Sequence, residues 1–172
     1  MSEIAGKFYG KYRATVVNNI DPLLLGRIQV IVPDVSNVLP SSWAMPCVPV
    51  AGLNMGMYTV PPIGAGVWIE FEQGDPDYPI WVGCFWGSAA EVPVLARTVP
   101  PAVPGITLQT TAKNGIVISD VPGPTGGILI QTTSGATISV SDVGIIIMNG
   151  KGAIINLTGP TVDINAGALT AI

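Results

Sequence analysis

The second half of the chain repeats short β-branched runs: GIVIS (115–119), GILIQ (127–131), ATISV (136–140), GIIIM (144–148), AIINL (153–157) and TVDIN (161–165). Residues 100–172 contain no aromatic residue, and their only charged residues are Lys113, Asp120, Asp142, Lys151 and Asp163. Because β-branched residues favour strands while Gly and Asn favour turns, this pattern predicts a repetitive β tail. Every aromatic residue lies in the first half of the chain, which predicts a globular head.

Within each run, alternate apolar residues point to one face of the strand. The pairs are Ile116 and Ile118, Ile128 and Ile130, Ile138 and Val140, Ile145 and Ile147, Ile155 and Leu157, and Val162 and Ile164. A β-helix made by one chain needs about twenty residues per coil, which leaves only about three layers here. Three chains that each supply one strand per layer reach twice that height and leave no lateral edge open. We therefore expect an intertwined homotrimer, a triple-stranded β-helix with these residues at its axis.

The first half of the chain contains five predicted strands and no helix. The strands are expected at residues 7–18, 26–33, 43–50, 67–73 and 79–87, with a loop at 51–64 and a tight turn at 74–77. Five strands in so short a segment are typical of a small closed barrel. The predicted domains are a barrel at 1–87, a Pro-rich linker at 88–105 and the β-helix at 106–172.

Composition excludes several classes of function. A net charge of −4 with only seven Lys and Arg argues against a nucleic-acid binder, which needs clustered cations. No uninterrupted apolar stretch reaches the roughly 18 residues of a membrane-spanning helix. Residues 1–19 lack the apolar core of a signal peptide, so we expect assembly in the cytoplasm. Cys47 and Cys84 are expected to be buried, reduced thiols or, alternatively, to form one disulfide.

Candidate chemistry is sparse. Glu70, Glu72, Asp75 and Asp77 form one acidic cluster, which is either an exposed strand face followed by a turn or a site for a hard cation. The chain has no His, so a Ser or Cys nucleophile has no His to act as its base. We expect no enzyme activity, no cofactor and no metal.

Two further clusters have competing interpretations. Trp68, Trp81 and Trp86 either stack on single-stranded nucleic acid, as in many barrels of this size, or pack within the core or between protomers. Lys7, Lys11 and Arg13 form either a solvated strand face or a surface that docks on an acidic partner. The acidic balance of the chain favours packing for the tryptophans.

Two stretches, GRIQVIVP (26–33) and PPIGAGVWIEFEQGDPDYPIWVGCFWG (61–87), followed by a Gly-punctuated β tail, resemble one family. It is the central spike proteins of contractile injection systems: phage baseplate assembly protein V, the barrel domain of the T4-type spike and the VgrG spikes of type VI secretion. The resemblance implies an OB-fold barrel followed by a triple-stranded β-helix. It also implies a homotrimer in a virion or injection-particle baseplate, which caps the tail tube and is driven through a target envelope when the sheath contracts.

Departures from the family's pattern refine this expectation. Only some twenty residues separate barrel and tail, too few for the lysozyme domain of the T4-type spike, and the first strand begins too early for the hub domain of VgrG. The hub is therefore expected to be a separate trimeric protein, docked through Lys7, Lys11 and Arg13. Without His, a metal-binding apex is not expected. The apolar C-terminus, with Leu169 and Ile172, suits a separate tip protein of the PAAR type.

Two other functions stay open at this point. The barrel could be a binding module for a glycan or single-stranded nucleic acid on a trimeric stalk. A wall-cleaving enzyme is the least favoured, because the chain has neither the room nor a His.

Overall fold

The computed structural model describes residues 6–171 of an all-β chain. The chain forms two compact units that divide between Glu91 and Val92. We call the first unit the head and the second the tail.

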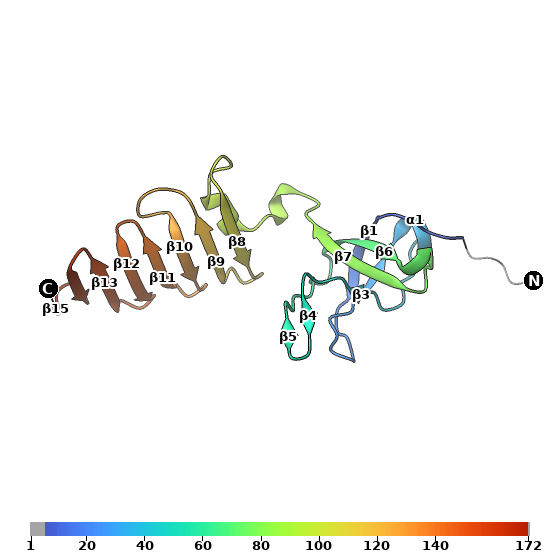
Figure 1. Ribbon diagram of the computed structural model, residues 1–172, viewed down its shortest axis with the longest axis horizontal. Helices are drawn as coiled ribbons and strands as arrows, with labels where there is room; N and C mark the ends of the chain where they lie inside the picture. Colours follow the sequence, from blue (N-terminus) through green and yellow to red (C-terminus); the bar gives the residue numbers. More distant parts are fainter. Residues whose placement is uncertain (1–5, 172) are drawn as a thin grey trace, which may run out of the picture. The chain divides into compact units, whose positions relative to one another are not determined.

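The head is built on a five-stranded sheet in the order β2-β1-β6-β7-β3 (Figure 1). Its strands are β1 (Tyr12–Asn18), β2 (Gln29–Ile31), β3 (Met45–Pro46), β6 (Gly66–Phe71) and β7 (Pro79–Phe85). Isolated bridges from Ile28 to Ala44 and from Ile31 to Pro40 bring the segment before and at the start of β3 back beside β2. The sheet thereby curls toward closure as in an OB fold. All five predicted strands are present.

Period-two alternation builds the core of the head. On β6 the side chains of Val67, Ile69 and Phe71 are buried, while the residues between them are half-buried. Ile28 and Val30 are completely buried, as the sequence pattern predicts for one face of this strand.

The structure differs from the prediction in two places in the head. A four-residue helix, α1 (Pro33–Ser36), follows β2 where the sequence predicts no helix. Proline at the first helical position has its φ already set and needs no hydrogen-bond partner, so Pro33 both ends the strand and starts the turn. The predicted loop at 51–64 contains a hairpin of β4 (Ala51–Gly52) and β5 (Met55–Gly56).

The tail is an eight-stranded sheet in which each strand pairs with the next one along the chain (Figure 1). Its strands are β8 (Gly105–Gln109), β9 (Gly115–Ser119), β10 (Gly127–Gln131), β11 (Ala136–Ser141), β12 (Gly144–Asn149), β13 (Ile154–Thr158), β14 (Thr161–Ile164) and β15 (Leu169–Ala171). All of these pairs are antiparallel. One chain thus supplies one strand per layer, and eight layers at about 4.8 Å span about 34 Å. The six predicted runs are all strands, and β8 and β15 extend them at both ends.

Glycine is required at two strand entries in the tail. Gly127 and Gly144 have φ of +76° and +151°. A Cβ at Gly127 would lie 2.0 Å from the carbonyl oxygen of Val140, and one at Gly144 would lie 2.2 Å from that of Leu157. The close approach of the next strand therefore excludes any side chain at these positions.

The Pro-rich segment forms short 3₁₀ turns, η2 (Ala89–Glu91) and η3 (Val94–Thr98). Leu95 is 7% exposed, and its backbone N–H donates to Oε1 of Gln109 over 2.9 Å. A Cβ at Gly115 would lie 2.5 Å from Cδ1 of Leu95, so η3 packs directly on β9. The later part of the predicted linker is thus built into the tail.

Candidate functional site: the apolar face of the tail

The strand register places the predicted axis residues on one face of the tail sheet. Two columns of directly paired residues run along this face. One contains Leu108, Ile116, Ile130, Ile138, Ile147, Ile155, Ile164 and Leu169; the other contains Ile106, Ile118, Ile128, Val140, Ile145, Leu157 and Val162. We call this surface the apolar face of the tail. It includes all twelve residues predicted from the sequence and adds Ile106, Leu108 and Leu169, which that prediction did not place at the axis.

This face is open in the single chain. Ile147 is 40% exposed, and Ile118, near the other end of the column pair, is 43% exposed. Neighbouring strands cover these side chains only from the sides. The outward surface of the face stays open to solvent among the described residues. An apolar surface of this extent marks an interaction site.

The opposite face is different in chemistry. Its central column runs through Thr107, Val117, Leu129, Ser139, Ile146, Asn156 and Asp163. This face thus mixes apolar and polar residues, whereas the apolar face carries no polar or charged residue along either column. The difference favours the apolar face as the interaction surface.

The acidic and basic clusters of the head pair with each other. Nζ of Lys7 lies 3.6 Å from Oδ2 of Asp75, and Lys11 forms an ion pair with Glu70. Among residues 6–171, no three His, Cys, Asp or Glu side chains gather as metal ligands. Docking of a hub through these lysines stays a prediction, and it would have to compete with pairs that already exist.

Arg13 and the tryptophans have separate environments. The Arg13 guanidinium lies 5.1 Å from the ring centre of Trp68 and 5.0 Å from that of Phe85. Trp81 is buried, whereas Trp86 is 62% exposed. The three tryptophans therefore do not share one exposed platform.

The cysteines match neither of the two predicted alternatives. Both Cys47 and Cys84 are free and exposed, so they are not buried thiols and no disulfide joins them. Each lies near the end of a barrel strand, where the core no longer covers it. Partial burial nevertheless raises the pKa of the Cys84 thiol.

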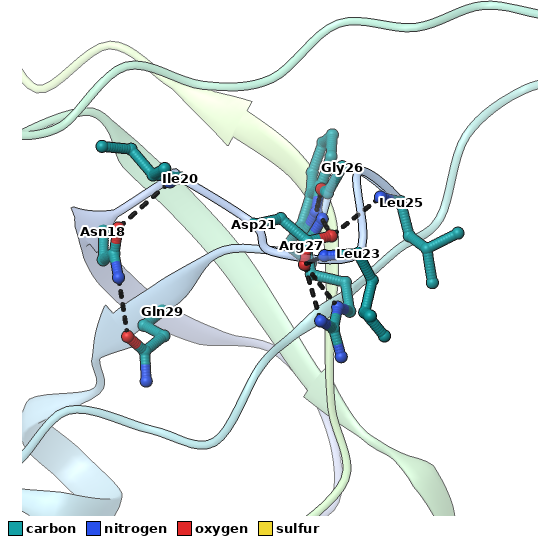
Figure 2. A network of polar contacts seen from close by, with 9 residues as sticks. Asn18, Ile20, Asp21, Leu23, Leu25, Gly26, Arg27 and Gln29 are labelled. Carbon is teal, nitrogen blue, oxygen red and sulfur yellow. Dashed lines mark hydrogen bonds and ion pairs between the residues drawn. The ribbon is translucent and has the colours of Figure 1, made fainter.

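A buried carboxylate that sequence reasoning did not single out organises the loop between β1 and β2 (Figure 2). Oδ1 of Asp21 accepts from Nη2 of Arg27 at 2.6 Å and from the Leu23 N–H at 3.0 Å, and Oδ2 accepts from the Leu25 N–H at 2.8 Å. The Arg27 guanidinium, together with these backbone N–H groups, holds the pKa of Asp21 well below its usual range. The carboxylate acts locally, since its hydrogen-bond partners lie two to six positions later in the chain, and the alternation pattern of the sequence does not point to it.

Comparison with known families adds independent information. The family model of the type VI secretion system/phage-baseplate injector OB domain matches residues 12–86. That of the phage baseplate V C-terminal trimerisation domain matches residues 105–170. No curated protein matches the chain. Among the described residues, no helix has the length and apolar character needed to cross a membrane.

Proposed function

Since the chain is a baseplate spike protein with an injector OB domain and the phage baseplate V trimerisation domain, we propose a mechanical role for its homotrimer. Three copies form the central spike that caps the tube of a contractile injection machine and punctures the target envelope when the sheath contracts.

The observation that carries this proposal is the apolar face of the tail. Two columns of Ile, Leu and Val run through the tail layers without a polar residue. Three such faces, turned toward a common axis, bury one another. The opposite, partly polar face of each tail then stays outside, in contact with water. A closed, dry axis resists the water entry that would begin unfolding under load.

Glycine and β-branched residues suit the shape of such a needle. Side chains no larger than Ile and Leu allow three sheets to approach closely at the axis, where aromatic rings would hold them apart. Gly127 and Gly144 allow the chain to turn tightly into β10 and β12.

The proposed tip partner would contact the last strand of the tail. β15 is the last strand of the sheet, and Leu169 on it is 61% exposed. A free strand edge with an apolar side chain is suited to a protein cap, which supports a PAAR-type tip protein. Ile172, the other residue predicted to contact a tip, lies outside the described residues. We further propose that the head docks on a separate trimeric hub, and that contact with the target membrane is transient.

Complementation of an injection particle tests this role. A strain that lacks the chain is supplied with the native protein, with Ile147→Asp or with Met148→Asp, and particle assembly and target killing or infection are measured. Residues 147 and 148 are adjacent, equally exposed in the single chain at 40% and 39%, and on opposite faces. We expect activity from the native chain and from Met148→Asp. Full activity of Ile147→Asp would contradict the proposal.

A further inference from the structure

The head carries a second apolar surface that the tail does not explain. A cavity of about 370 Å³ opens beside the β4–β5 hairpin. Its wall includes Leu25, Met45, Val50, Met55, Met57 and Tyr58. Met55 and Tyr58 are 63% and 68% exposed. No side chain in this wall carries a formal charge, so the cavity is suited to an apolar group.

The hairpin also carries a projecting apolar group. Leu53 lies in its two-residue turn and is 95% exposed. Asn54, the second residue of this turn, has a φ of 55°, a conformation that Asn adopts more readily than most residues. A Cβ at Gly56 would lie 2.9 Å from the carbonyl oxygen of Val50, so the strands of the hairpin approach closely. The leucine is therefore presented on a short, well-defined turn.

One wall of the cavity is held rigid. The backbone N–H of Leu25 is fixed by Asp21, and the carbonyl oxygen of Gly26 accepts from Nε1 of Trp81 at 3.1 Å (Figure 2). Because Trp81 belongs to the barrel core, the loop is tied to the core rather than free to close. A preformed cavity loses less conformational entropy when it is filled.

A neighbouring copy of the chain is the occupant that fits this pair of features. A threefold assembly needs two different, complementary surfaces on each copy, since its contacts run head to tail around the ring. The head offers such a set: a projecting leucine and an uncharged cavity. The tails hold three heads together at an effective concentration in the millimolar range, at which a small contact suffices.

We propose that Leu53 of each head inserts into the cavity of a neighbouring head in the same trimer. This inference rests on the homotrimer of the proposed function. It adds a contact between the heads to the contact between the apolar faces of the tails.

Photo-crosslinking in the full-length chain tests the contact. A benzophenone amino acid replaces Leu53, and trimers are assembled from a mixture of isotope-labelled and unlabelled chains. We expect links between labelled and unlabelled copies, to the peptides that contain Met45, Met57 or Tyr58. The control is the same probe at Val38, which is 77% exposed and outside the cavity wall; it should give no such links.

Light scattering on the same samples shows whether a missing link reflects the absence of the contact between heads or the absence of the trimer. The proposed contact between heads would be refuted if a trimeric sample gave links confined to one chain, links to the tail, or no links. A monomeric sample would instead contradict the trimer itself.

Methionine oxidation provides a second readout without a probe. In native trimers Met55 and Met57 should be oxidised by peroxide about tenfold more slowly than in Leu53→Asp trimers, since burying a leucine shifts a contact equilibrium by about that factor. Met148, on the other face of the tail, serves as the internal reference. Equal oxidation rates in the two proteins would argue against insertion of Leu53.

Discussion

Ile147→Asp places a carboxylate on the apolar face of the tail. Ile147 pairs with Ile138 on one side and with Ile155 on the other, so the new charge has no cation or hydrogen-bond donor among its paired neighbours. In the trimer that we propose, the 40% of Ile147 that is exposed in the single chain would face the axis. All three chains carry the substitution at the same layer, and three carboxylates therefore meet there.

The magnitude is large compared with the stability of a complex. Burial of an unpaired carboxylate costs several kcal/mol after relaxation, so three in one layer cost on the order of 10 kcal/mol. A complex with nanomolar affinity has about 12 kcal/mol of binding free energy. The substitution should consequently abolish the trimer rather than weaken it slightly.

Multi-angle light scattering of the purified variants measures the effect. Met148→Asp is the matched control, because its side chain has nearly the same exposure in the single chain but lies on the opposite face. Ile147→Val, which removes one methylene per chain at about 1 kcal/mol, should keep the trimer. Normal trimers of Ile147→Asp, or equal loss of trimers in Met148→Asp, would refute the assignment of the inner face.

Two further predictions concern stability. Gly144→Ala should lower the melting temperature of the tail, measured by calorimetry, more than Gly152→Ala does. Both positions have positive φ, but only a Cβ at Gly144 would meet a backbone oxygen, at 2.2 Å. Equal effects would mean that backbone strain alone determines the loss. The head should lose stability as pH falls below about 4, because the pKa of Asp21 is lower in the folded state than its unfolded value of about 3.9. The carboxylate's contribution is complete above that pH and declines with acidification, so chemical denaturation at pH 7 and pH 3 should show a smaller difference for Asp21→Asn than for the native head. An unchanged difference in the variant would assign the acid sensitivity to other groups.

The sequence predicts the regular parts of this molecule well, because they follow from local periodicity. Each of the six β-branched runs forms a strand. The alternation within the runs predicts which residues share a face, and the strand register places these residues in continuous columns. The sequence pattern does not assign Ile106 and Leu108 to this face, because they follow a Pro-rich segment that is typical of a linker. Only their pairing with Ile118 and Ile116 places them on it.

The parts that could not be predicted lack a local periodic pattern, and two of them depend on contacts between distant residues. The docking of Leu95 on the tail joins residues 14 positions apart through the amide of Gln109. Trp81 and Gly26 are 55 residues apart in the chain. The hairpin at Leu53 has no alternating pattern of its own, because each of its strands contains only two residues. Periodicity carries no signal for contacts of this kind.

The most direct test of the central claim is the molar mass of the native, full-length chain in solution, measured by light scattering, and its mobility in sodium dodecyl sulfate without boiling. Three chains of 17.7 kDa closed around an apolar axis should give a trimer that survives the detergent until it is heated. A 17.7 kDa species in native buffer would mean that the apolar face of the tail is not closed by two further copies, and the spike account would fall.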